Sequence, residues 1–243
     1  MPCRNAWARK EPILNIRNRE KRLARFYGDV ARDQNRDIIN LINGKKILEI
    51  GCGYGTLLDQ IRRERDDIMA SGIDMDPDAI SIAKGLYGID VQRLSVNEMD
   101  FPDNFFDTVI LRDVIHHLAG AGRLGDALTR IRRICNKELI VFDPNPNFIV
   151  KVSRKLIRHK DPEAQPEQVM AALEANGFKV AAHSWRDTIA FPLSGGFVGI
   201  EFVPNIGFIK KSIIKLDSCI NLACRRLDLQ RYACWRYLIY ATK

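Results

Sequence analysis

The sequence predicts an α/β fold in which helices flank a doubly wound, mostly parallel sheet of seven strands. Three observations support this prediction. Strand-like apolar runs alternate with helix-compatible segments through most of the 243 residues, as in consecutive βα units. The first apolar run leads into glycines at alternate positions. The second ends in Asp74, about 20 residues further on, and both features are typical of the ligand-binding edge of such a sheet.

The order of the elements follows from hydrophobic periodicity. Apolar residues recur at helical spacing over 17–42, which predicts an N-terminal helix. Apolar runs of strand length predict strands at about 46–50, 69–74, 89–94, 106–112, 138–142, 178–183 and 235–241. Helical patterns fall near 56–65, 77–86, 126–135 and 166–176. Residues 1–16 precede these patterns and are predicted to form a flexible basic tail, and 17–243 to form one domain.

Two stretches, at about 144–164 and 185–232, are longer than the connections that a sheet of this kind needs. Long loops in a compact domain are usually functional, and both stretches follow strands at the edge where ligands bind. We therefore predict that they form a C-terminal cap over the substrate. The apolar segment 188–209 within the cap contains Pro192, Pro204 and a central Glu201, which argue against a bilayer-spanning helix.

The composition indicates a globular protein whose charge is unevenly distributed. Apolar residues make up 46% of the chain and charged residues 28%, with a formal net charge of +8. Basic residues are concentrated in 1–25, 151–160 and 210–243, which would suit an anionic membrane surface or nucleic acid, or would simply be solvated. Six scattered cysteines and the lack of a signal-peptide pattern favour reduced thiols, a cytoplasmic location and no bound metal.

The glycines after the first strand predict a ligand site built from main chain. Glycine permits backbone angles that other residues avoid, and it leaves room for a ligand against the N–H groups at a helix start. A dinucleotide-binding loop would place its third glycine at position 56, where this chain has Thr56. The spacing is instead Glu-x-Gly-x-Gly-x-Gly, from Glu49 to Gly55.

This pattern resembles the first motif of the class I S-adenosylmethionine (SAM) dependent methyltransferases. Three further blocks occur in the order expected of that family: Gly72–Pro77, Phe101–Leu111 and Leu139–Pro144. The resemblance covers about 45–146. It implies SAM as the cofactor and a seventh strand that runs antiparallel between the fifth and sixth.

The resemblance also implies a set of cofactor-binding residues. They are Tyr27, Glu49, Gly51, Cys52, Gly53, Gly55, Asp74, Met75, Ser95, Val96 and Arg112. Asp74 would receive the ribose hydroxyls, and Tyr27 would lie on a helix that covers the methionine end of SAM. One position departs from the family, because Ser95 stands where an Asp usually meets the adenine amino group. The adenine contact is therefore expected to be weaker or shifted, to Val96 N–H or to Asn97.

Methyl transfer from a sulfonium depends mainly on placing the acceptor, and a general base is needed only if the acceptor must lose a proton. His116 and His117, after the fourth strand, are the candidates for that base, with helix capping or structural support as the alternative role. The sequence lacks the Asn/Asp-Pro-Pro-Tyr/Phe motif of adenine methyltransferases after that strand.

We therefore predict a methyltransferase that acts on an oxygen or carbon atom of a small or lipid-linked metabolite, with peripheral contact to the inner face of an anionic membrane. An RNA or tRNA methyltransferase and a non-catalytic SAM-binding regulatory protein are the alternatives.

Overall fold

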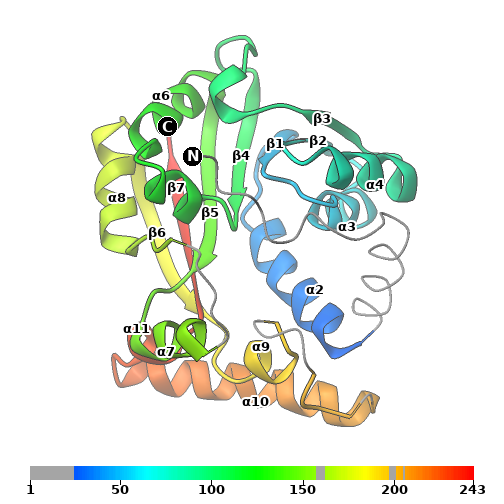
Figure 1. The fold of residues 1–243 in the computed structure, drawn as a ribbon, viewed down its shortest axis with the longest axis vertical. Helices are drawn as coiled ribbons and strands as arrows, with labels where there is room; N and C mark the ends of the chain where they lie inside the picture. Colours follow the sequence, from blue (N-terminus) through cyan, green and yellow to red (C-terminus); the bar gives the residue numbers. More distant parts are fainter. Residues whose placement is uncertain (1–24, 157–161, 197–200, 205) are drawn as a thin grey trace.

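The computed structural model describes residues 25–156, 162–196, 201–204 and 206–243. The predicted basic tail, 1–16, and the predicted start of the N-terminal helix at 17 lie outside these residues. Within them, helices flank a single sheet, and a further group of helices lies beyond the ends of its strands (Figure 1).

The sheet has seven strands in the order β3-β2-β1-β4-β5-β7-β6. Neighbouring strands are parallel from β3 to β5, whereas β7 runs antiparallel to both β5 and β6. The predicted fold class is therefore confirmed, including the antiparallel last strand. The strands are β1 (Lys46–Ile50), β2 (Met69–Asp74), β3 (Asp90–Arg93), β4 (Phe106–Arg112), β5 (Cys135–Pro144), β6 (Lys179–Arg186) and β7 (Arg236–Thr242).

Helices alternate with the parallel strands and continue into the two long connections. They are α2 (Phe26–Ile39), α3 (Thr56–Glu64), α4 (Pro77–Tyr87), the short 3-10 helix η1 (Val96–Glu98), α5 (Ile115–Gly120), α6 (Leu124–Ile134), α7 (Phe148–Leu156), α8 (Pro166–Ala175), α9 (Ala190–Leu193), α10 (Gly207–Arg226) and α11 (Gln230–Ala233).

Local sequence explains the sharp limits of α4. The side chain of Asp76 accepts a hydrogen bond from the backbone N–H of Asp78, and Pro77 occupies the first turn, where its missing N–H costs nothing. Gly88 ends the helix in the left-handed conformation.

Strands β5 and β6 are longer than predicted because strand pairing extends them beyond the hydrophobic pattern. Residue Cys135, predicted as the end of a helix, is the first residue of β5 and pairs with Phe106 of β4. Strand β6 continues to Arg186 instead of ending at 183, because Arg186 pairs with Arg236 of β7. The mixed burial of β6, an edge strand, hides this extension in the sequence.

Side chains of successive strand residues point to opposite faces, and each face has its own hydrophobic cluster. On β4, Val109 and Leu111 belong to one cluster and Ile110 to the other. A third cluster joins the first turns of α2 to the long connections beyond the sheet, and its buried members are Phe26, Val30, Val150, Ala190, Phe191, Val203 and Trp235.

The carboxyl ends of β1 to β6 meet at one edge of the sheet, because β6 is antiparallel to β7 and so runs with β5. Helix α7 follows β5 at this edge, and α9, α10 and α11 lie between β6 and β7 in the sequence. Figure 1 shows these four helices together at the bottom of the molecule, beyond the strand ends. In the described part of the chain, no helix is both long and apolar enough to cross a bilayer.

Candidate cofactor and acceptor site

The loop after β1 turns through three glycines whose φ angles are 73° at Gly51, 51° at Gly53 and 76° at Gly55. Glycine adopts such angles with less strain than any residue that carries a Cβ atom. A Cβ atom added to Gly51 would lie 2.2 Å from Cγ2 of Val114, so this glycine lets the chain between β4 and α5 pack against the loop. An added Cβ at Gly53 would meet no described atom within 4 Å, so there is open space over this glycine.

Asp74 at the end of β2 lies directly beside this loop. Its Oδ2 accepts a hydrogen bond from the backbone N–H of Gly53 at 2.7 Å, and its Oδ1 accepts one from Asp76 N–H at 2.9 Å. A carboxylate offers about four acceptor positions, so about two remain for a ligand. Asp74 therefore fixes the loop and still presents unused acceptor capacity at the edge of the sheet.

Cys52 has a packing role within the loop. A Cβ added to Gly72 of β2 would lie 2.8 Å from both Cβ and Sγ of Cys52, so the thiol fills the space that this glycine leaves. Burial raises the pKa of the Cys52 thiol, with Glu49 and Asp74 adding to the rise. The thiol therefore stays neutral and supports the loop from beneath.

Glu49 is a buried carboxyl under the loop, 3% exposed, and its Oε2 has no hydrogen-bond partner among the described residues. Burial raises its pKa to about 8; Arg112 opposes the rise, while Asp74 and Asp113 add to it. Near neutral pH this carboxyl is therefore largely protonated, and a cationic group placed against it would favour its ionised form.

Arg112 at the end of β4 binds helix α2. Its guanidinium donates hydrogen bonds to the side-chain oxygen of Asn35 and, at 3.1 Å, to that of Gln34. Sequence reasoning missed both amides, although a signal was present. Gln34 lies four residues from Val30 and from Ile38, on the apolar stripe of the helix, where a polar side chain needs a partner.

A cleft of about 500 Å³ opens beyond β2 and β3, next to the predicted adenine position. Its lining includes Met75 and Ser95, which the sequence assigned to the cofactor, together with Asn97 and Glu98. Val96 is buried beside this cleft and does not line it. The Ser95 hydroxyl accepts a hydrogen bond from Asn97 N–H at 3.3 Å, so it already caps η1. Glu98 was missed, although it adds a carboxylate to the cleft.

The start of α2 is tied to the connection between β6 and β7. The backbone N–H of Phe26 donates to Glu201 Oε1 at 2.6 Å, and Lys210 Nζ lies 2.7 Å from Asp29 Oδ2. Phe26 is fully buried in the third cluster, whereas Tyr27 is half-buried against it. The long connection thus holds the helix that carries Tyr27.

The two predicted catalytic histidines have different environments. His116 is 3% exposed, and its Nδ1 lies 2.9 Å from Oδ2 and 3.0 Å from Oδ1 of the buried Asp143. The backbone N–H of His116 also donates to Asp143, at 3.2 Å. With Nδ1–H assigned as the donor, Nε2 is the acceptor nitrogen, as a general base requires. His117 is exposed.

Asp113 does not cap α5, which begins after Val114 without a side-chain cap. Its backbone is left-handed, with φ 58°, and its carboxylate binds the buried Arg236 of β7 at 2.5 and 2.8 Å. Burial acts to raise the pKa of Asp113, but Arg236 holds it below its usual value. The Arg236 guanidinium stacks near the ring of Phe142, 4.7 Å from its centroid.

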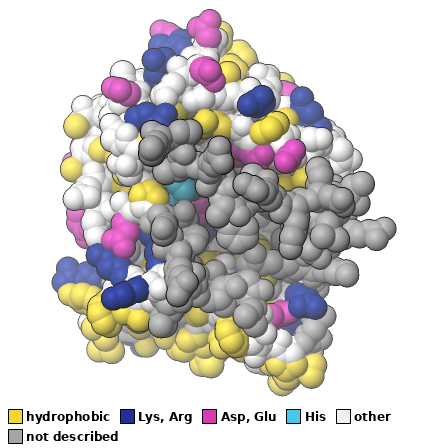
Figure 2. All heavy atoms as spheres, viewed as in Figure 1, with side chains coloured by type: hydrophobic (Ala, Val, Ile, Leu, Met, Phe, Trp, Pro, Cys, Tyr) yellow, Lys and Arg dark blue, Asp and Glu magenta, His cyan; other side chains and the backbone are white. Residues whose placement is uncertain are grey.

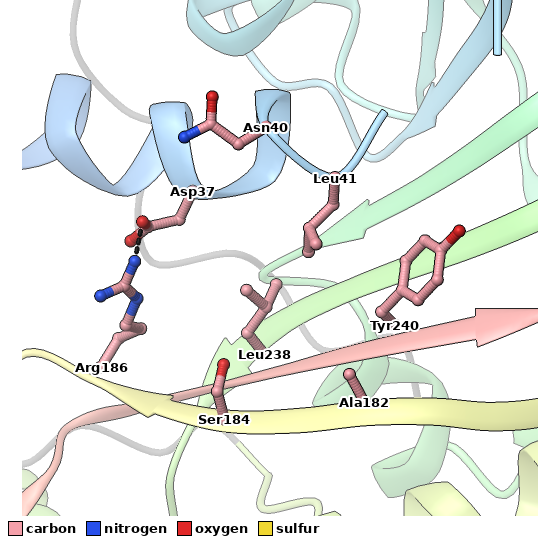
Figure 3. A pocket seen from close by; sticks show the side chains of 8 residues that line it. All are labelled: Asp37, Asn40, Leu41, Ala182, Ser184, Arg186, Leu238 and Tyr240. Carbon is pink, nitrogen blue, oxygen red and sulfur yellow. Dashed lines mark ion pairs between the residues drawn. The ribbon is translucent and has the colours of Figure 1, made fainter. Parts of the chain in front are cut away.

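A separate hollow of about 300 Å³ lies between α2 and the face of β6 and β7 (Figure 3). Asp37 and Arg186 point toward one another across it and form an ion pair. None of the predicted site residues lines this hollow. Among the described residues, no group of three or more His, Cys, Asp or Glu side chains is placed to hold a metal ion.

The strand order, the glycine loop after β1 and the acid at the end of β2 together define the class I SAM-dependent methyltransferase fold. A solved structure described as a SAM-dependent methyltransferase from Archaeoglobus fulgidus has the same fold. It superposes with a TM-score of 0.65 at 19% identity, over 88% of this chain and 94% of that one.

The chain belongs to the family described as methionine biosynthesis protein MetW, whose family model matches residues 32–167, more than half of the sequence. Curated methyltransferases are also similar. A ubiquinone biosynthesis O-methyltransferase from Bradyrhizobium is 32% identical over 97 residues, which are 37% of this chain and 36% of that protein.

The phosphoethanolamine N-methyltransferase 3 of Arabidopsis thaliana is 28% identical over 130 residues, which are 49% of this chain and 26% of that protein. The matched part therefore spans only about a third or less of these curated relatives.

Proposed function

We propose that the chain binds SAM along the carboxyl edge of β1 to β4 and transfers its methyl group to an oxygen or carbon atom of a small or lipid-linked acceptor. The observation that carries the proposal is the open space over Gly53 beside the Asp74 carboxylate. Open space over a glycine, the start of helix α3 and an acid with unused acceptor positions form a site for a ribose-containing ligand.

The residues beside the loop suit the methionine end of SAM. The buried Glu49, with its unpartnered Oε2, would face the cationic amino group of the ligand, and the start of α3 at Thr56 would face its carboxylate. Arg112, through Gln34 and Asn35, positions α2 and with it Tyr27. We therefore assign to Arg112 the role of holding α2 in place, and to Tyr27 the role of covering the methionine end of SAM.

The adenine end would lie in the cleft lined by Met75, Ser95, Asn97 and Glu98. Ser95 and Glu98 hold each other through the cap of η1, since Ser95 N–H donates to Glu98 Oε2 at 3.1 Å. The remaining acceptor positions of the Glu98 carboxylate can receive an exocyclic amino group. We therefore assign to Glu98 the contact that the Asp usually found at position 95 would make, with Val96 packed beside the cleft.

When bound, SAM supplies an electrophilic methyl group on its sulfonium. His116 supplies a base oriented by Asp143, in the acceptor tautomer at Nε2. Val114, two residues earlier, packs on Gly51 and thereby keeps the start of α5 against the glycine loop. A neutral amine needs no base, whereas a hydroxyl or an activated carbon must lose a proton, so this pair favours an oxygen or carbon acceptor.

The cap supports an acceptor with an apolar part. Phe191 and Trp235, with ring centroids 6.0 Å apart, are buried in the cluster that joins α9 to α2, close to the edge where the site opens. The names of similar proteins include ubiquinone biosynthesis and dimycocerosate methyltransferases, which also favours an apolar or lipid-linked acceptor. We place this reaction in the cytoplasm, next to the inner face of a membrane.

Turnover separates this proposal from SAM binding without catalysis. The full chain would be incubated with methyl-labelled SAM and either the organic or the aqueous extract of cells that lack it. We expect label in the organic extract and release of S-adenosylhomocysteine, both dependent on His116. Label only in RNA, or no transfer to either extract despite SAM binding, would overturn the proposed reaction.

A further inference from the structure

Three helices of the cap present apolar side chains to the outside. Phe148 of α7 is 78% exposed, Phe208 of α10 is 81% exposed, and Tyr232 of α11 is 53% exposed. Figure 2 shows hydrophobic side chains gathered along the lower edge of the molecule, where Figure 1 places α7, α10 and α11. Helix α11 contacts both α7 and α10, so the three form one continuous surface.

Helix α10 shows how this surface is composed. It has 20 residues, which corresponds to a length of about 30 Å. One face packs inward through Ile213, Asp217 and Ile220, whereas Phe208 and Leu222 lie on the outward face with Lys215. Asp217 is the only acid of the helix, and it is buried, where it accepts hydrogen bonds from the N–H groups of 188–190.

The outward side therefore carries more basic than acidic side chains. Helices α7 and α11 contain no acid, and the exposed Asp228 lies between α10 and α11. Lys151 of α7 is paired with Glu163 at 3.1 Å. The exposed basic residues on α7 and α10 are Lys151, Lys155, Lys211, Lys215, Arg225 and Arg226. In Figure 2, Lys and Arg side chains border the apolar lower edge.

We propose that the outward surface of α7, α10 and α11 docks on an anionic lipid bilayer, with Phe148, Phe208 and Leu222 entering the headgroup boundary and Lys211, Lys215 and Arg226 facing the lipid charges. Large apolar side chains that enter the headgroup boundary, with Lys and Arg beside them to meet the lipid charges, are typical of elements that bind at an anionic membrane surface. Protein interfaces, by contrast, are depleted in lysine.

The docked orientation is set by the fold. Helix α7 follows the carboxyl end of β5, and α9 to α11 connect β6 to β7, so the surface lies at the same edge of the sheet as the glycine loop. Docking would bring this edge to the lipid, where a lipid-linked acceptor is held; this purpose rests on the proposed function, whereas the docking itself does not. Lys210, which pairs with Asp29 of α2, belongs to the inward face and is not part of the docking surface.

The test is flotation of the full chain with vesicles of phosphatidylcholine alone or mixed with phosphatidylglycerol, at low and high salt. We expect binding that requires the anionic lipid and weakens with salt. Each basic residue near an anionic surface contributes about fivefold in affinity, so the double variant Lys211→Glu, Lys215→Glu should bind at least about 25-fold more weakly. Phe208→Ser combined with Leu222→Ser should also weaken binding.

Matched controls lie at the opposite edge of the sheet. Lys84→Glu with Lys179→Glu makes the same change of net charge, and Met69→Ser with Leu86→Ser removes two exposed apolar side chains. Both controls should float like the unchanged protein. Absence of flotation with anionic vesicles at low salt, equal loss in the charge control, or full binding by the Phe208/Leu222 variant would each overturn the proposal. Calorimetry with SAM on the same variants reports the proposed function separately.

Discussion

Asp113 and Arg236 form a two-point ion pair that joins the end of β4 to the start of β7, with Oδ1–Nη1 and Oδ2–Nη2 distances of 2.5 and 2.8 Å. Arg236 is 6% exposed, and its Nε has no partner among the described residues. The pair lies where the chain leaves β4 toward α5 and where it returns from α11 to β7. Because the guanidinium is buried, its charge depends on the carboxylates around it, and Asp113 is the one that contacts it directly.

Asp113→Asn should therefore destabilise the protein by about 2 kcal/mol, since the buried guanidinium loses its direct counter-ion while the Asp113 side chain is itself 44% exposed. Asparagine tolerates the left-handed backbone at this position, so the change isolates the charge. The free energy of unfolding in urea measures the effect. Asp228→Asn is the matched control, because Asp228 also has a positive φ, 54°, but is exposed. Its free energy of unfolding should fall by no more than about 0.5 kcal/mol. Equal losses in the two variants would contradict the role of the ion pair.

The buried Glu49 predicts that the ligand-free protein becomes less stable as the pH rises. The pKa of Glu49 in the folded state is about 8, against an ordinary value of 4.5. Between these two values the folded protein keeps a proton on Glu49 that the unfolded chain has lost. This stability is fully present below the ordinary pKa and is lost as the pH rises toward 8. Asp187, whose pKa burial raises to about 7, acts in the same direction.

Unfolding in urea at about pH 6 and about pH 8.5 should show a loss of a few kcal/mol for the unchanged protein and a smaller loss for Glu49→Gln. Glu174→Gln, an exposed position on α8, serves as the control and should keep the full pH dependence. A pH dependence that is the same with and without Glu49 would show that this carboxyl is ionised in the folded protein.

The His116–Asp143 pair predicts that the two adjacent histidines differ in their effect on turnover. His116→Gln should lower kcat by about 100-fold or more, whereas His117→Gln should leave it nearly unchanged. Asp143→Asn should lower kcat as well, because it favours the wrong tautomer of His116. Melting temperature and SAM affinity, measured on each variant, separate this effect from unfolding. Full activity in His116→Gln would remove this histidine from the chemistry.

The cleft at η1 predicts that Glu98 recognises the adenine amino group. Glu98→Ala should weaken S-adenosylhomocysteine by about 10-fold or more, because a hydrogen bond to a charged acceptor is lost. The same variant should bind S-inosylhomocysteine, which lacks the amino group, like the unchanged protein does. Asn97→Ala, in the same cleft, is the comparison. Equal weakening of both ligands by Glu98→Ala would mean that it acts only through the cap of η1.

The sheet could be predicted from the sequence because its signals are local. Buried parallel strands contain continuous apolar runs, such as 139–142 in β5, and the glycines and Asp74 follow the first two strands at a fixed spacing. The same spacing predicted that the glycine loop and Asp74 lie together, and Gly53 N–H does bind Asp74.

The missed residues depend on contacts between distant parts of the chain. Gln34 and Asn35 belong to the site only because they accept hydrogen bonds from Arg112, about 77 positions later, and Asp143 because it contacts His116. Local sequence patterns also do not show that Arg236 pairs with Asp113. Buried polar partners of this kind follow from the tertiary fold, so sequence periodicity alone cannot supply them.

The central claim, that SAM occupies the space over Gly53, is tested most directly by calorimetric titration of SAM into Gly53→Arg and Gly88→Arg. The two glycines match, because both have positive φ, 51° and 58°, and an added Cβ meets no described atom within 4 Å at either. Gly88 lies before β3, at the opposite edge of the sheet. We expect SAM binding by the unchanged protein and by Gly88→Arg, and none by Gly53→Arg. Undiminished SAM binding by a folded Gly53→Arg protein would contradict the account.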